Sequence, residues 1–317
     1  MIKFLNIFQH KIVLIFFLFL FFLSSIETKI AFIDIFDQLI FQVFVIGLFL
    51  ACINFLFRKI LFFIFYLIIS IILFLQIINS CEQCSHQISD INQNFNKINI
   101  MTLNAGYSSE NNELNNIIGI IMEKNVDVLF LQEISPDFQK KLKNLNNVFL
   151  YQVGLNKDID FWDSVILSKY PLIDSHNNLT NATQATLLFN NKKITIVGIH
   201  LYPPIKQRLF ISTINQMNYW SDFFKSSNNE FIFVGDLNMT NVSKRFKNFL
   251  KEANLFTHSS IFKPNFTWPS FLPNFMGIQI DHILFSKHFK IMNKEVVNQF
   301  SSDHRALFAT LVLESEI

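Results

Sequence analysis

The chain has 317 residues, of which 51% are hydrophobic, and its mean hydropathy of +0.33 is too high for an ordinary soluble protein. The apolar excess lies in the first 80 residues, and the remainder is long enough for one large domain or two small ones. The net charge is only +2, and from Lys97 onward 21 Lys and Arg stand against 19 Asp and Glu, so no basic footprint of a nucleic-acid-binding protein is visible.

Three apolar stretches open the chain, at Ile12–Ile26, Ile35–Phe57 and Ile60–Ile78. The second and third are long enough to span a bilayer, because about 20 apolar residues cross the hydrocarbon core. The first is shorter and follows Lys3 and Lys11, which is also typical of a signal sequence, but no small-residue cleavage site follows it. We therefore expect a membrane region in residues 1–80 with three transmembrane helices, with a cleavable signal as the alternative for the first.

Basic residues indicate the orientation of such a region. Lys3, Lys11, Arg58 and Lys59 would all lie on one side of the membrane, and the positive-inside rule makes that side the cytoplasm. An odd number of spans then places the rest of the chain outside the cytoplasm, in the periplasm next to the inner membrane if the source is bacterial.

Residues 81–96 are polar and are predicted to be a linker. Its Cys81 and Cys84 suggest a small-loop disulfide in an oxidising compartment, with a zinc site that lacks a fourth ligand as the alternative. The third part of the chain, residues 97–317, is predicted to be a folded domain.

That domain mixes strands and helices in chain order. Strands are predicted at Ile98–Leu103, Val126–Leu131, Val148–Val153, Ser164–Leu167, Ala185–Phe189, Lys193–Ile199, Phe231–Val234, Ile278–Phe285 and Ala306–Leu313. Helices are predicted at Asn112–Asn125, after Ser135-Pro136, at Lys206–Phe224 and from a Ser243 cap to Ala253. Asn190-Asn191 indicates a hairpin between two of the strands. This mixture predicts an α+β or α/β fold rather than a helical bundle.

The segment FIFVGDLN is the centre of the functional interpretation. Its apolar strand Phe231–Val234 ends at Gly235, and Asp236 and Asn238 follow where the chain leaves the sheet. Taken alone, GDLN is more simply an ordinary turn. Complementary polar residues at other strand ends change that interpretation, and the full candidate set is Asn104, Glu133, His200, Asp236, Asn238, Asp281, Asp303 and His304. All of them except Asp281 lie at or next to a predicted strand end or start.

The residue types in this set suit phosphate chemistry. Glu133, Asp303 and the amide of Asn104 offer hard oxygen atoms, which Mg²⁺ prefers. Two histidines and an amide donor suit a phosphate that must be held while its leaving group is protonated. The set contains no cysteine and the chain has no HExxH motif, which argues against zinc hydrolysis.

The ordered series TLNAG, FLQE, IHL, GDLN, IDHIL and SDHRALFATL resembles the endonuclease/exonuclease/phosphatase superfamily over about Lys97–Leu313, and GDLN followed by SDH is its most specific part. The HLYPP and TWPS segments behind an anchor are similar to a membrane-bound bacterial subgroup. The resemblance implies a four-layer α/β/β/α sandwich of two mixed sheets, with the active site at one edge.

The resemblance also implies roles for the candidates. Glu133 would be the main ligand of Mg²⁺, for which Mn²⁺ can substitute, with Asn104 and Asp303 beside it. Asp236 would orient and deprotonate the attacking water, Asn238 would donate to the phosphate, and Asp281 would orient His304. His200 stands where apurinic endonucleases carry a tyrosine, and this departure argues against abasic-site repair.

The sequence thus predicts a membrane-anchored, Mg²⁺-dependent phosphoesterase whose partners are the lipid bilayer and a phosphoester substrate. The near-neutral charge favours a phospholipid or a small phosphodiester over DNA. Two alternatives stay open, a DNase-like endonuclease of the same fold and a catalytically inactive, membrane-tethered binding or scaffold protein.

Overall fold

The computed structural model describes residues 2–78, 96–106, 111–155, 163–177, 181–227, 229–258, 265–273, 276–298 and 301–314. The chain forms two compact units. The first consists of Met1–Glu82, Pro204–Ile211 and Thr240–Asn248, and the second of Gln83–Pro203, Ser212–Met239 and Phe249–Ile317. Cys81 and Cys84, with almost all of the expected linker, lie outside the described residues, so their pairing stays a prediction.

The first unit contains the four N-terminal helices, α1 (Ile2–Leu23), α2 (Ala31–Gln38), α3 (Ile40–Leu56) and α4 (Ile60–Ile78). Within the described part of the chain, α4 is the one helix that is long and apolar enough to cross a membrane. The pair α2 and α3 passes the same test only together, and it is bent by 59°. The span expected at 35–57 is therefore not one continuous helix, because Leu39 leaves the helical backbone with φ −103° and ψ 16°. The apolar part of α1, Lys11–Leu23, is shorter than a span.

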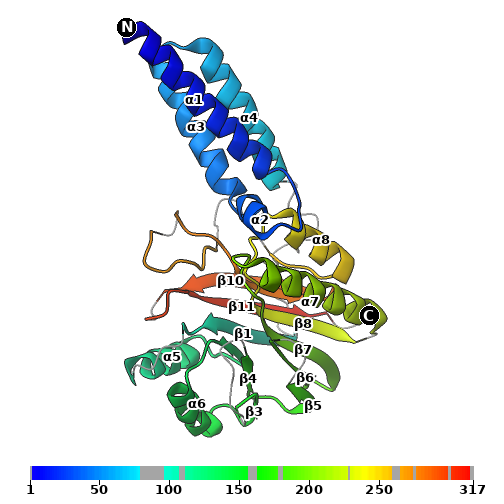
Figure 1. Cartoon of the computed structure of the whole chain (residues 1–317). Coiled ribbons are helices and arrows are strands. Elements are labelled where there is room, and N and C mark those ends of the chain that lie inside the picture. The colour runs from blue at the N-terminus through cyan, green and yellow to red at the C-terminus, as the bar shows by residue number, and fades with distance from the viewer. Residues whose placement is uncertain are drawn as a thin grey trace. The chain divides into compact units, whose positions relative to one another are not determined.

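A glycine allows α1, α3 and α4 to pack closely (Figure 1). A Cβ atom added to Gly47 of α3 would lie 2.5 Å from Ser70 Oγ on α4 and 2.9 Å from the Phe17 ring on α1. Phe17 is almost fully buried at this contact. Small residues at such crossings are typical of helices that associate within a membrane.

The second unit contains two mixed sheets. The six-stranded sheet has the order β10-β11-β1-β2-β4-β3 and the five-stranded sheet has the order β5-β6-β7-β8-β9. The strands of the first are β1 (Asn96–Asn104), β2 (Val128–Gln132), β3 (Tyr151–Val153), β4 (Ser164–Ser168), β10 (Phe289–Val297) and β11 (Ala306–Leu313). Those of the second are β5 (Leu172–Asn177), β6 (Ala182–Phe189), β7 (Lys192–His200), β8 (Glu230–Asp236) and β9 (Asp281–Phe285).

Alternation along the strands builds the layers. In β1, Ile98 and Ile100 belong to the core between the two sheets, whereas Met101 and Leu103 pack with the helices on the outer face. These helices are α5 (Asn111–Glu123) and α6 (Pro136–Leu142), and the 3₁₀ helix η2 (Lys143–Asn147) follows α6. On the other side, α7 (Gln207–Ser226) and α8 (Lys244–Ala253) reach β8 through aromatic side chains, with Phe233 lying 5.7 Å from both Trp220 and Phe249 between ring centroids. The expected α/β/β/α sandwich is confirmed (Figure 1).

Local signals explain where the predicted strands were right and where they were not. The hairpin turn is confirmed, since Asn190 and Asn191 both have positive φ, as a type I′ turn requires. Strand β5 was not predicted from the sequence. It departs from a regular strand, because its register is irregular between Ile173 and His176 and Asp174 has a positive φ. Strand β9 starts at Asp281 rather than at the predicted Ile278, which moves Asp281 from a strand interior to a strand end.

Candidate active site

Strand register brings three candidates side by side in the five-stranded sheet. The parallel pair β7–β8 aligns His200 with Asp236, and the antiparallel pair β8–β9 aligns Asp236 with Asp281. Since β7 and β8 end at this edge while β9 begins there, residues that are 36 and 45 positions apart in the sequence occupy adjacent strand positions. All three are at most 1% exposed.

The six-stranded sheet brings its candidates to its edge in the same way. The parallel pair β1–β2 aligns Asn104 with Gln132, so that Glu133 follows directly. Strand β11 runs antiparallel to β1, and Asp303 and His304 precede its first residue. Ser302 Oγ donates a 2.6 Å hydrogen bond to the Asn104 carbonyl, which fixes this segment beside the end of β1.

Asn104 joins the two sheet edges. Its Nδ2 donates to Glu133 Oε1 at 2.9 Å and to Asp236 Oδ2 at 3.1 Å, while its Oδ1 accepts from the Gly106 amide at 3.0 Å. His200 Nε2 lies 3.4 Å from the same Glu133 oxygen and 3.9 Å from the same Asp236 oxygen. The carboxylates of Glu133 and Asp236 therefore both lie next to the Asn104 amide and the His200 imidazole.

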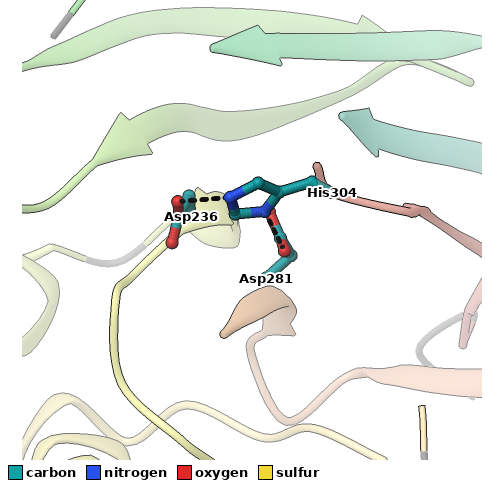
Figure 2. Close-up of side chains that lie close together, drawn as sticks. All are labelled: Asp236, Asp281 and His304. Atoms are coloured by element: carbon teal, nitrogen blue, oxygen red, sulfur yellow. Dashed lines mark hydrogen bonds and ion pairs between the residues drawn. The ribbon is translucent and has the colours of Figure 1, made fainter. Parts of the chain in front are cut away.

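His304 lies between two buried acids (Figure 2). Its Nδ1 is 2.9 Å from Asp281 Oδ2 and its Nε2 is 3.7 Å from Asp236 Oδ2. Ligand atoms of these three residues lie within 4.8 Å of one another, close enough for one metal ion. A protonated imidazole cannot bind a metal, so the charge state of His304 decides between a metal cluster and a proton-holding arrangement.

The charges of the protein's own side chains favour the second arrangement. Burial lowers the pKa of His304, but the charge and hydrogen bond of Asp281, with Asp236 and Asp303, raise it to about 10. Burial acts to raise the pKa of Asp281, and the charge and hydrogen bond of His304 outweigh this effect and lower it. At neutral pH the pair is an imidazolium and a carboxylate. Burial, followed by the charge of Asp281, raises the pKa of Asp236 to about 7.

The backbone at the end of β8 is specialised for this site. Gly235 has φ +147°, and a Cβ atom there would lie 1.9 Å from the Ile199 carbonyl oxygen. Glu133 and Asn238 both have φ 50°, which is uncommon for residues with a side chain and recurs at functional sites. Asn238 is held by its own amide, which donates to Asp236 Oδ1 at 2.8 Å, and by Nδ2, which donates to the Leu201 carbonyl at 2.8 Å.

Asp303 lies at the exposed side of the cluster and has a partner that sequence reasoning missed. The Trp268 indole N–H donates to Asp303 Oδ2 at 3.0 Å. Thr267, the neighbour of Trp268, accepts hydrogen bonds from the amides of Ile280 and Asp281 at 3.2 Å each. The adjacent Thr-Trp pair was the available sequence signal, but nothing in it indicated which acids it would support.

The oxygen donors fit a hard divalent cation. Burial raises the pKa of Glu133, the Asn104 hydrogen bond opposes this, and the charges of Asp303 and Asp281 raise it further. A cation beside Glu133 would relieve that repulsion between acids. The Glu133 side chain is 18% exposed, and the Asn104 oxygen retains a second lone pair beside the one used by Gly106.

The family model described as "Endonuclease/Exonuclease/phosphatase family" matches residues 99–304. The chain belongs to this family. Its members are hydrolases that act on phosphoester bonds, and they depend on divalent metal ions. No curated protein matches the chain closely enough to add a relative.

Solved structures of the family share the fold. Beta toxin from Staphylococcus aureus has a TM-score of 0.54 at 19% identity, covering 67% of this chain and 99% of its own. The D. rerio TDP2 complex with a single-strand DNA product has a TM-score of 0.55 at 16% identity, with 68% and 98% covered. The human Nocturnin catalytic domain with bound sulfate has a TM-score of 0.53 at 17% identity, with 69% and 95% covered. At these identities the likeness establishes the fold alone.

Proposed function

We propose that the chain is a membrane-anchored, Mg²⁺-dependent phosphoesterase that hydrolyses a phospholipid or a small phosphodiester. The observation that supports this proposal best is the convergence of Asn104, Glu133, His200, Asp236 and His304 at one edge of both sheets. It also rests on the proposed division into a membrane region (1–80), a linker (81–96) and a catalytic domain (97–317).

Glu133, with Asp303 and the Asn104 oxygen, would hold the cation. When bound, Mg²⁺ supplies charge that polarises the phosphate and stabilises the negative charge of the transition state. Mn²⁺ has the same ligand preference and is expected to substitute. The hydrogen bond from Trp268 would keep Asp303 oriented toward this position.

Asp236 is proposed to take the proton of the attacking water. Its raised pKa, about 7, is suited to a general base that works near neutral pH. Asn104 Nδ2 donates to the Asp236 carboxylate, and the Asn238 amide donates to its other oxygen, so the base has a fixed orientation. One N–H of the Asn238 side chain is used by Leu201, and the second is available to donate to a phosphate oxygen.

His304 is proposed to stabilise the phosphate as an imidazolium, with Asp281 holding its ring through Nδ1. His200 is buried beside Glu133 and Asp236 and is proposed to contact the phosphate or to protonate the leaving group. Both roles need a donor at the transferred phosphate, and histidine is the usual residue for this at neutral pH.

Contacts within the first unit support an extracytoplasmic catalytic domain. Residues of Thr240–Asn248 bind α2 through Asp34, Asp37 and Gln38, and the Lys247 Nζ donates to the Gln76 carbonyl near the end of α4 at 3.1 Å. Segments that follow α1 and that end α4 thus meet the same stretch of chain. Such an arrangement agrees with the expected three spans, and with the cytoplasmic location of Arg58 and Lys59, if α1, whose apolar part Lys11–Leu23 is shorter than a usual span, also crosses the bilayer. External protease should cleave the domain in intact spheroplasts, and complete protection would contradict this topology.

The test is a substrate panel with the full chain in detergent, with Mg²⁺ or with chelator. The panel contains a bis-aryl phosphodiester, phospholipids, inositol phosphates, oligonucleotides and plasmid DNA. Asp236→Ala and His304→Ala should abolish turnover. Asp137→Ala, at an exposed position of α6, serves as the matched control. Preferred cleavage of DNA with steep salt dependence would identify a nuclease instead, and the absence of Mg²⁺-dependent turnover on every substrate would favour the inactive scaffold.

A further inference from the structure

Helix α2 has its polar and apolar faces reversed. Asp34, Asp37 and Gln38 are 1%, 0% and 6% exposed, whereas Phe32 is 68% exposed and Ile30, directly before the helix, is 53% exposed. A surface helix in water buries its apolar face and presents its polar face to solvent. Helix α2 does the opposite, so contact with water is unfavourable for the apolar side chains on its outer face.

Each residue of the buried polar face has a partner in the same unit. Arg245 Nη2 lies 2.8 Å from Asp34 Oδ1, the Lys244 amide donates to Asp37 at 2.8 Å, and the Thr240 amide donates to Gln38 Oε1 at 2.6 Å. An ion pair and hydrogen bonds of this kind offset the cost of burying charged and polar groups. They determine which face of α2 points outward.

Basic residues lie beside the exposed apolar ones. The Gln207 side chain accepts from the Ala31 amide at 2.9 Å and donates to the Lys29 carbonyl at 2.6 Å, which places the segment Pro204–Ile211 next to the start of α2. Together the two segments expose what we term the α2 surface, consisting of Lys29, Ile30, Phe32, Ile205, Lys206 and Arg208. Ile205 is 75% exposed.

The nearby acidic residue Glu27 does not cancel the positive charge of Lys29, Lys206 and Arg208. Glu27 accepts a 2.7 Å hydrogen bond from Asn248 Nδ2 and lies 3.9 Å from Arg245 Nη1. Arg245 therefore offsets part of the charge of Glu27, whose side chain is 38% exposed. The segment Pro204–Ile211 contains no acidic residue.

We propose that the α2 surface lies in the headgroup layer of an anionic lipid bilayer. Ile30, Phe32 and Ile205 would enter the boundary with the acyl chains, where apolar burial is favourable, and the basic residues would meet lipid phosphates. This inference rests on the membrane anchoring in the proposed function. It names a bilayer as the occupant because α2 passes into α3 through a single residue, Leu39, with a 59° bend.

The apolar exposure continues into the adjoining helix. Phe49 and Phe55 of α3 are 64% and 61% exposed, and Leu61 at the start of α4 is 80% exposed. An interfacial helix that turns into a membrane-facing helix needs exposed apolar residues on both helices.

Spin labels test the proposal in the full chain reconstituted in nanodiscs of phosphatidylcholine with phosphatidylglycerol. In a background with Cys52, Cys81 and Cys84 changed to serine, single labels are attached at Phe32→Cys and Ile205→Cys. The expected result is high accessibility to oxygen and low accessibility to a water-soluble nickel reagent. Leu150→Cys, at a residue of similar exposure in the second unit, should give the opposite ratio.

Two further arms make the result decisive. A label at Ile72→Cys in α4 reports the spanning helix, so a bilayer signal there with an aqueous signal at position 32 overturns this inference alone. The double variant Lys206→Gln and Arg208→Gln should remove the increase in depth that phosphatidylglycerol causes, whereas Lys192→Gln with Lys193→Gln should not. Shielding of position 32 from both reagents would indicate a protein partner and would also overturn the proposal. None of these readouts requires turnover, so failure of the proposed function is scored separately.

Discussion

The substitution Asp281→Asn tests how the site holds a proton. It removes one negative charge and retains the shape of a side chain that is 1% exposed and lies 2.9 Å from His304 Nδ1. Burial lowers the pKa of His304, and Asp281 is the largest of the three carboxylate influences that raise it from 6.5 to about 10. That difference corresponds to about 5 kcal/mol in favour of the imidazolium.

The sign of the pH dependence follows. Because its folded-state pKa is raised, His304 contributes its full stabilisation below pH 6.5, and this contribution declines as the pH rises and is lost once the pH has passed about 10. The wild-type enzyme should keep its imidazolium through pH 9. Without Asp281, burial dominates, and His304 should be neutral at pH 8.

The assay is kcat/KM for a bis-aryl phosphodiester with Mg²⁺ between pH 5.5 and 9.5. We expect Asp281→Asn to lower kcat/KM at pH 8 by about 100-fold or more, with a smaller loss at pH 5.5, because losing one preorganised donor to a developing negative charge costs about 10²–10³-fold. Asp137→Asn, on an exposed carboxylate, should match the wild type. An unchanged value at pH 8, or an unmoved alkaline limb, would refute the reasoning.

Three further outcomes are expected of the full chain in detergent. Gly235→Ala should lower the free energy of unfolding by about 3 kcal/mol in urea titrations, since its Cβ would lie 1.9 Å from the Ile199 oxygen, while Gly119→Ala, with no atom within 4 Å, should not destabilise. Burial lowers the pKa of Lys294 from 10.5 to about 7, so its contribution to stability should rise by about 5 kcal/mol between pH 7 and 10.5. The contribution of His304 falls over much of the same range, so the measured quantity is the stability of the wild type minus that of Lys294→Met. This difference should rise with pH, and a difference that stays constant would contradict the prediction. Chelator should abolish turnover and lower the melting temperature, and Mg²⁺ should restore both; turnover in excess chelator would exclude the metal.

Much of the fold could be predicted because its signals are local. The apolar run before Gly235, the Asn190-Asn191 turn and the Ser243 cap, whose Oγ accepts from the Phe246 amide at 3.3 Å, each depend on a few adjacent residues. Strand β5 lacks such a signal. The break at Leu39 was not predicted either, and the residues that bind α2 beside it, Arg245 and Thr240, lie over 200 positions away in the sequence.

The candidate site also has a part that could be predicted from the sequence and a part that could not. All of its residues except Asp281 could be selected because they adjoin a predicted strand end, and register then aligned His200, Asp236 and Asp281. The supporting contacts could not be predicted, since the Trp268 bond to Asp303 depends on the path of a loop rather than on any spacing.

The central claim is that one divalent cation and one phosphorus atom meet at these side chains, and pulsed EPR of the Mn²⁺-loaded chain with bound inorganic phosphate tests it most directly. The account predicts bound Mn²⁺ with a ³¹P hyperfine coupling, and loss of the bound ion in Glu133→Ala but not in Glu123→Ala on α5. Mn²⁺ binding that is insensitive to Glu133, or bound Mn²⁺ without ³¹P coupling, would contradict it.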